Sequence, residues 1–114
     1  MHRALLFTLF FLLARPAFGG CGEYESSCVA IIGGEAEEMA CQVTECSNIR
    51  SGFTYFELAN GGTAEINYDT NGSRIKVDGG EGRLLGKEKL PSEVHAENLS
   101  CYTRTGTEIY CIRR

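Results

Sequence analysis

The chain has 114 residues, with 11 basic and 15 acidic residues and a net charge of −4. This acidic balance argues against binding to the phosphate backbone of nucleic acids or to anionic lipid surfaces. The length is that of one small domain with a modest hydrophobic core.

Residues 1–19 are typical of a secretory signal peptide. Arg3 gives a positively charged start, residues 4–14 are almost entirely apolar, and Ala17-Phe18-Gly19 places small residues where signal peptidase reads the chain. The apolar run is shorter than the roughly 20 residues that span a bilayer. We therefore expect cleavage after Gly19, leaving residues 20–114 as a single disulfide-stabilised β domain, secreted or periplasmic.

The acidic residues of this expected mature domain are unevenly spread. Residues 20–49 contain six glutamates and no Lys or Arg, whereas residues 50–114 contain nine residues of each sign. The net charge of the mature domain, −6, therefore belongs to its first third. Such a segment can attract a basic partner or simply aid solubility.

Residues 27–32 are rich in β-branched side chains and predict a strand that ends at Gly33-Gly34. Residues 35–46 fit a helical spacing of apolar residues and a strand alternation equally well, so both alternatives stay open. If this segment is a strand, a type II′ turn at Gly34-Glu35 would place Cys28 directly opposite Cys41.

The middle of the chain predicts three strands, residues 53–59, 63–70 and 73–78, separated by Asn-Gly turns. With Asn71-Gly72 as a type I′ turn, Tyr68 would oppose Ile75. One face of the last two strands would then be apolar. Its residues would be Ala64, Ile66, Tyr68, Ile75 and Val77.

After a looser stretch, residues 79–98, the chain predicts a last hairpin of residues 99–104 and 108–112. A three-residue loop between them would place Cys101 opposite Cys111, and Cys21 would then pair with Cys46. Six cysteines behind a signal peptide predict three disulfides. The expected fold is mostly β: a small antiparallel sheet of five to seven short strands, as a meander, compact sandwich or small barrel, with at most one short helix near 35–46.

No pattern indicates a catalytic, cofactor or metal site. The cysteine spacings do not match the close pairs of zinc sites. The stretch Asp69–Ser73 begins like a calcium loop, but its glycine is misplaced and a hairpin turn explains it. His95 is the only histidine after residue 19 and belongs to no recognisable triad. A small secreted hydrolase with paired carboxylates is the enzymatic alternative.

Two segments, Ser51-Gly52-Phe53-Thr54-Tyr55 and residues 62–68, locally resemble the Ser-Gly-x-x-Tyr region of periplasmic inhibitors of C-type lysozymes. The cysteine layout differs from that family. The resemblance implies a small, exported, β-rich protein that binds a cationic enzyme.

The leading hypothesis is an exported non-enzymatic binding module, of the inhibitor or immunity type, for a cationic protein. Acidic residues would attract this partner and aromatic residues would anchor it. The residues expected at the interface are Glu35, Glu37, Glu38, Phe53, Tyr55 and Tyr102. The alternative is an envelope-associated structural protein, held at a membrane only if Cys21 is lipidated, because Phe18-Gly19-Gly20-Cys21 resembles a bacterial lipobox.

Overall fold

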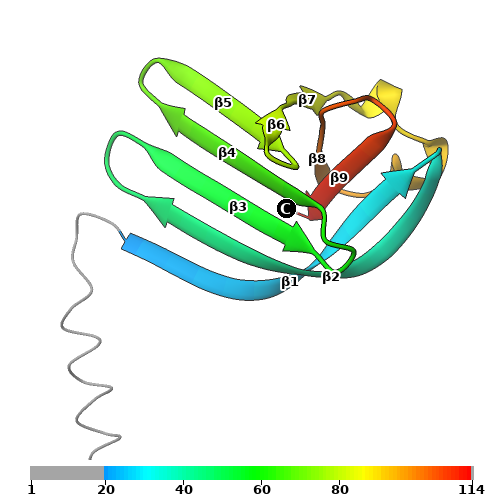
Figure 1. Ribbon diagram of the computed structural model, residues 1–114, viewed down its shortest axis with the longest axis horizontal. Helices are drawn as coiled ribbons and strands as arrows, with labels where there is room; N and C mark the ends of the chain where they lie inside the picture. The colour runs from blue at the N-terminus through cyan, green and yellow to red at the C-terminus, as the bar shows by residue number, and fades with distance from the viewer. Residues whose placement is uncertain (1–19, 114) are drawn as a thin grey trace, which may run out of the picture.

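The computed structural model describes residues 20–113, which form a single antiparallel sheet of nine strands (Figure 1). The strands are β1 (Gly20–Ile32), β2 (Glu35–Ser47), β3 (Gly52–Leu58), β4 (Thr63–Asp69), β5 (Gly72–Val77), β6 (Gly80–Glu81), β7 (Arg83–Leu85), β8 (Leu99–Thr103) and β9 (Glu108–Arg113). Their order across the sheet is β6-β5-β4-β3-β2-β1-β9-β8-β7. The expected mostly β class is confirmed. The expected signal peptide lies outside the described residues.

The first two strands form one long hairpin of 13 residues each, so residues 35–46 are strand and not helix. Its turn is Gly33-Gly34, where both glycines have positive φ, 60° and 86°. A type I′ turn needs positive φ at both central positions, and two glycines adopt that conformation without steric cost, so the turn lies one residue before the expected one. Ile32 therefore pairs with Glu35, and Cys28 lies opposite Met39 instead of Cys41.

All three expected disulfides are present. Cys21–Cys46 and Cys101–Cys111 join directly opposed residues, with Cα atoms 3.9 and 4.0 Å apart. Cys28–Cys41 is a diagonal bridge across the same hairpin, with a Cα separation of 5.8 Å. The observed register differs from the expected one by two residues, and Cys28 and Cys41 still lie on one face of the hairpin. Side-chain directions in a strand repeat every two residues, so such a shift does not change them. Such a bridge set is typical of proteins in oxidising compartments.

The strands β3, β4 and β5 form the expected meander, again with a register two residues from the predicted one. The turn is Thr70-Asn71, because the Asp69 carboxylate accepts the backbone N–H of Asn71 at 2.8 Å and fixes the bend there. Ile66 therefore opposes Ile75. The predicted apolar face is confirmed: Ala64 and Val77 are buried in the core and Ile66 and Ile75 pack against it.

The sheet curls until its two ends approach one another, so that β5 lies near β7 and β8 (Figure 1). Only Gly82 separates β6 from β7 in the chain, although these strands lie at opposite ends of the sheet order. The backbone N–H of Gly82 donates to the Ile75 carbonyl at 2.9 Å. The concave side encloses the larger hydrophobic cluster, which includes Val43, Phe56 and Ile112.

A second cluster covers the outer face of β1, β8 and β9. Val94 and Leu90, from the segment that holds the short 3-10 helices η1 (Lys87–Lys89) and η2 (Ser92–Val94), pack there against Val29 and Ile31. Cys28 and Ala30 belong to the inner cluster. The second half of β1 is therefore buried on both faces.

Tyr110 of β9 links the two ends of the curled sheet. Its side chain is 4% exposed, and its hydroxyl donates to Asp78 Oδ2 at 2.9 Å. The other carboxylate oxygen of Asp78 accepts the Thr63 backbone N–H at 3.0 Å. Burial, followed by the hydrogen bond and charge of Asp78, raises the pKa of the Tyr110 phenol. The phenol therefore stays protonated and keeps donating at any physiological pH.

We predict that Tyr110→Phe lowers the free energy of unfolding by about 1.5–3 kcal/mol, because hydrogen bonds to charged acceptors contribute about that much. Urea denaturation of the oxidised protein measures this. The matched control is Tyr68→Phe, on a side chain that is 45% exposed, which should change stability by less than about 0.5 kcal/mol. Equal losses in the two variants would contradict a special role for the Tyr110–Asp78 pair.

Candidate functional site

A cleft of about 670 Å³ opens on the inner face of the sheet, and we call it the tyrosine cleft. It lies between the first half of β1, the strands β3 to β5, and the ends of β8 and β9. The residues that matter for its chemistry are Tyr24, Glu45, Ile66, Tyr68, Tyr102 and Ile112. Three tyrosines and two isoleucines give it walls that are mainly apolar, with hydroxyl groups at their ends.

Two of these tyrosines are unusually accessible. Tyr24 is 44% exposed and Tyr68 is 45% exposed, and both are among the most exposed large hydrophobic side chains of residues 20–113. Tyr68 lies against Gly52 of the neighbouring strand, where a Cβ atom would be only 2.1 Å from the tyrosine ring. Gly52 thus allows the ring to lie directly over the backbone of β3. Tyr102 sits deeper, with its ring 6.1 Å from that of Phe56.

Glu45 supplies the negative charge of the cleft. Burial is the main cause that raises the pKa of Tyr24, and the charge and hydrogen bond of Glu45 raise it further. Tyr24 therefore remains a protonated donor at neutral pH. Among residues 20–113 the ion pairs formed are those of Arg113, so the carboxylate of Glu45 has no cationic partner there.

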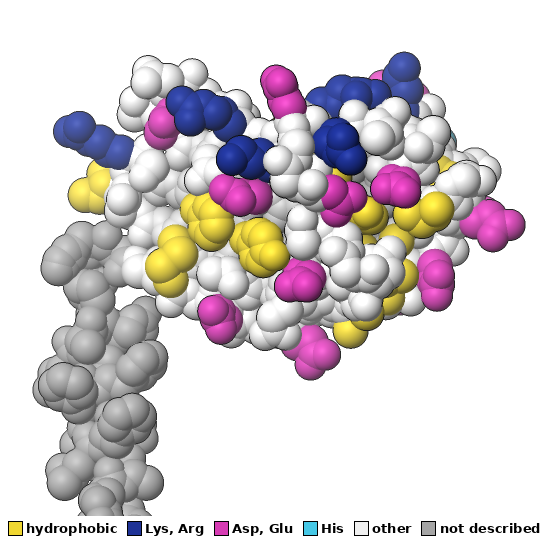
Figure 2. Space-filling model, in the orientation of Figure 1, with side chains coloured by type: hydrophobic (Ala, Val, Ile, Leu, Met, Phe, Trp, Pro, Cys, Tyr) yellow, Lys and Arg dark blue, Asp and Glu magenta, His cyan; other side chains and the backbone are white. Residues whose placement is uncertain are grey.

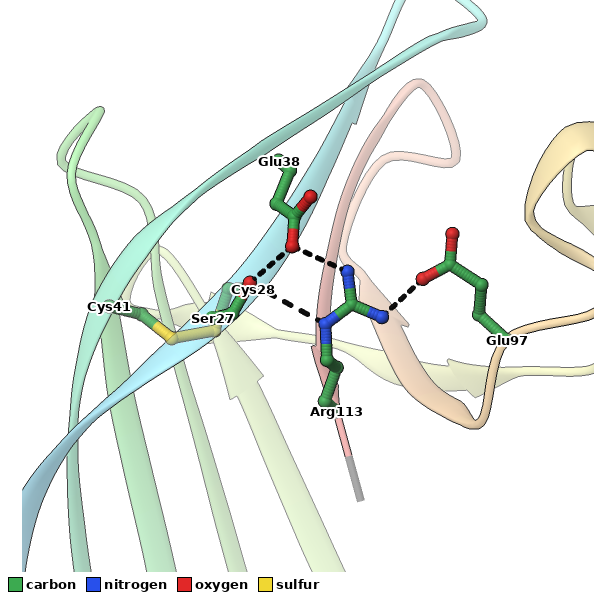
Figure 3. Close-up of polar contacts among 6 residues, drawn as sticks. All are labelled: Ser27, Cys28, Glu38, Cys41, Glu97 and Arg113. Carbon is green, nitrogen blue, oxygen red and sulfur yellow. Dashed lines mark hydrogen bonds and ion pairs between the residues drawn. A yellow bond between two sulfur atoms is a disulfide. The ribbon is translucent and has the colours of Figure 1, made fainter.

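Arg113 lies at the rim of the cleft, but its charge is already compensated (Figure 3). Its Nη2 atom is 2.7 Å from Glu38 Oε2, and its Nη1 atom donates to Glu97. Ser27 Oγ donates to the same Glu38 oxygen at 2.6 Å. These contacts lower the pKa of Glu38, first through the Ser27 hydrogen bond and then through Arg113. They attach the end of β9 to β2 and to the segment before β8.

The interface residues expected from the sequence do not share one surface. Glu35 and Glu37 point to the same side of β2 near its turn, whereas Glu38 points to the other side and binds Arg113. Side chains alternate between the two faces of β3, and Phe56 is buried in the core, so Phe53 and Tyr55 point away from the core. Tyr102 is the member of that set that lines the tyrosine cleft.

Figure 2 shows the outer face, where hydrophobic side chains gather over β2 and β3 between acidic side chains, with basic side chains over β5. Phe53 and Tyr55 belong to this face and are half-buried. Burial, then Glu57 and Glu65, raises the pKa of Tyr55.

Sequence reasoning missed Tyr24, Glu45 and the role of Tyr68. The only available signal was Tyr68, which the hairpin analysis placed at the open end of an apolar face. Tyr24 lies in a stretch of glycines and glutamates that shows no strand alternation. Its place in the cleft depends on β1 being twice as long as the sequence indicated.

Other chemistry is sparse in the part of the chain that the structure describes. No group of three or more His, Cys, Asp or Glu side chains within residues 20–113 is arranged to hold a metal ion. His95 lies in the segment before β8, where its Nε2 atom is 2.8 Å from the Leu90 carbonyl oxygen. None of the helices described is long and apolar enough to cross a membrane.

Comparison with protein-family models, curated proteins and solved structures finds no match for this chain. The local resemblance noted in the sequence therefore does not assign a family, and the site must be interpreted from its own residues.

We predict that Arg113→Gln raises the pKa of Glu38 toward its ordinary value. Because the folded-state pKa of Glu38 is lowered, its contribution to stability is present above the ordinary pKa of a glutamate and is lost as the pH falls through the folded value. The stability difference between wild type and Arg113→Gln should therefore be largest near neutral pH and shrink on acidification. Carbon-detected NMR titration of the Glu38 carboxyl, and urea denaturation at several pH values, measure both effects. A Glu38 pKa unchanged by the substitution would contradict the contact.

Proposed function

We propose that this protein is an exported, non-enzymatic binding module that holds a cationic segment of a partner protein in the tyrosine cleft. The observation that carries the proposal is the exposure of Tyr24 and Tyr68, two large aromatic side chains that converge on the same concave cleft. Exposed aromatic side chains gathered in one hollow are typical of binding sites.

Tyrosine suits this role because it offers a large apolar ring and a polar tip, with few rotatable bonds to fix on binding. The three tyrosines come from strands, and the hairpin carrying Tyr24 is cross-linked twice, at Cys21–Cys46 and Cys28–Cys41. A preformed cleft on cross-linked strands reduces the entropy that association must overcome.

The charges favour a basic partner. Glu45 lies in the cleft without a cationic partner among the described residues, and Glu23 and Glu25 lie on the adjacent exposed half of β1. The one arginine at the rim is neutralised by Glu38 and Glu97. A negative potential around an aromatic cleft accelerates encounter with a cationic segment and rejects acidic ones.

A non-enzymatic role is supported by the residues of the cleft. The lining contains one carboxylate, that of Glu45, and paired-acid catalysis needs two. The raised pKa of the Tyr24 phenol makes this group a poor base at neutral pH. The disulfide between Cys21 and Cys46 favours this module over a lipid tether, because lipidation would use the same sulfur atom of Cys21.

We predict that the double variant Tyr24→Ser, Tyr68→Ser weakens binding of lysine- and arginine-rich peptides at least about tenfold, because truncating aromatic anchors typically costs more than 1 kcal/mol each. Fluorescence anisotropy with a defined set of labelled basic and acidic peptides measures this, at low and high salt. The matched control is Ile49→Ser, Leu84→Ser, which removes two exposed hydrophobic side chains, 88% and 59% exposed, outside the cleft.

Basic peptides should bind more tightly than acidic ones, and added salt should weaken their affinity. Equal affinity for peptides of both signs, or equal losses in the two double variants, would show that the tyrosine cleft is not the binding site.

A further inference from the structure

The strand β1 has neighbours on both sides for only part of its length. It pairs with β2 along all 13 residues, from Gly20 opposite Ser47 to Ile32 opposite Glu35. Its pairing with β9 covers Cys28 to Ile32 alone. Within residues 20–113, no strand pairs with the second side of Gly20–Ser27. The end of β9 at Arg113 lies just before this open edge.

The turn of the β1–β2 hairpin determines which backbone groups face the open edge. In an antiparallel pair, successive residues direct their N–H and C=O groups alternately to one neighbour and the other. Ile32 and Glu35 flank a two-residue turn and bond to each other across it, so even-numbered residues of β1 face β2. In agreement, the N–H of Gly33 donates to the Thr107 carbonyl, on the β9 side, at 3.3 Å. The groups of Cys21, Glu23 and Glu25 therefore point to the open edge.

Side chains alternate along the same stretch. Tyr24 points into the tyrosine cleft, and so the glutamates on either side of it, Glu23 and Glu25, point to the opposite face. A strand laid along this edge would place one set of its side chains beside Tyr24 and the other set beside the two glutamates.

We propose that the open edge of β1 binds an extended basic segment of a partner protein as an added strand, antiparallel to β1 and in line with β9. This inference rests on the proposed function and specifies its mode: backbone pairing with Cys21, Glu23 and Glu25. Basic side chains of the segment lie opposite Glu23 and Glu25, and apolar side chains between them enter the tyrosine cleft. Strand addition of this kind gives affinity through the backbone and specificity through alternate side chains.

Charge decides between a basic partner and a second copy of this chain. In antiparallel self-pairing, the registers with the greatest overlap of Gly20–Ser27 place Glu23 or Glu25 opposite another glutamate. Like charges directly opposite each other destabilise a strand pair, whereas opposite charges stabilise it. The same glutamates therefore disfavour self-association and favour a lysine- or arginine-containing strand.

Among residues 20–113, another stretch with an unpaired side is Glu35–Met39 of β2, because β3 pairs with β2 only from Cys41 onward. This stretch is also acidic, but none of its residues lines the tyrosine cleft. It provides a matched control, since Glu35→Lys, Glu37→Lys changes the charge of the molecule by the same amount as Glu23→Lys, Glu25→Lys.

The test uses the purified oxidised protein and a ten-residue peptide of alternating lysine and valine. A second version of the peptide carries N-methyl groups on alternate backbone nitrogens, which removes the donors needed for strand pairing. Amide hydrogen exchange by NMR should show new protection at Cys21, Glu23 and Glu25, with no change at the even-numbered amides already bonded to β2. The N-methylated peptide should bind at least about tenfold more weakly.

The Glu23→Lys, Glu25→Lys variant should bind the lysine peptide at least about tenfold more weakly and should bind an alternating glutamate–valine peptide. The control variant Glu35→Lys, Glu37→Lys should show neither change. Equal binding of the N-methylated peptide would overturn strand addition but leave intact the proposal that the tyrosine cleft binds a cationic segment. Loss of binding in the Glu35→Lys, Glu37→Lys variant would overturn the choice of edge. If sedimentation shows a dimer in the absence of peptide, and the same amides are protected in that dimer, the occupant of the edge is a second copy of this chain and the proposed basic partner is wrong.

Discussion

The burial of the second half of β1 on both faces is the constraint on which the rest of the structure depends. Cys28 and Ala30 face the inner cluster, while Val29 and Ile31 face the outer one. The same residues pair with β2 on one side and with β9 on the other. One short apolar stretch of four residues therefore positions both halves of the sheet. It holds the meander of β3 to β5 through β2, and it holds the C-terminal strands through β9.

The first half of β1 has a different environment, although it continues the same strand. It consists of small and polar residues apart from Tyr24, and β9 ends before reaching most of it. The ion pairs of Arg113 with Glu38 and Glu97 lie at this boundary and attach β9 to β2 and to the segment before β8 (Figure 3). Stability is thus concentrated in one half of the strand, and the accessible aromatic cleft adjoins the other half.

Much of this fold could be predicted from local patterns. The apolar face of β4 and β5, the last hairpin and all three cysteine pairs follow from alternation and from turn residues. The predicted registers of the two earlier hairpins were both wrong by two residues, because Gly33-Gly34 and Asp69-Thr70-Asn71-Gly72 each permit more than one turn. The predicted faces of these strands were still correct, because side-chain direction in a strand repeats every two residues.

The candidate site was harder to predict. The polar first half of β1 has no hydrophobic alternation, so its extension as strand depends on pairing with β2 and on the bridge from Cys21 to Cys46. The acidic residues that cluster in the sequence separate onto two faces, because neighbours in a strand point in opposite directions. Tyr24 and Tyr68 are more than forty residues apart in the chain and line the same cleft only because the sheet curls.

The arrangement of the disulfides has a consequence for how the chain reaches this state. The Cys28–Cys41 bridge is nested within the Cys21–Cys46 bridge, and Cys101–Cys111 follows both without crossing either. A chain that emerges from a ribosome or a translocation channel with its N-terminus first can complete the first hairpin, with both of its bridges, before any later strand is available. Both bridges of this hairpin therefore depend only on the pairing of β1 with β2, and neither needs a cysteine from the later part of the chain.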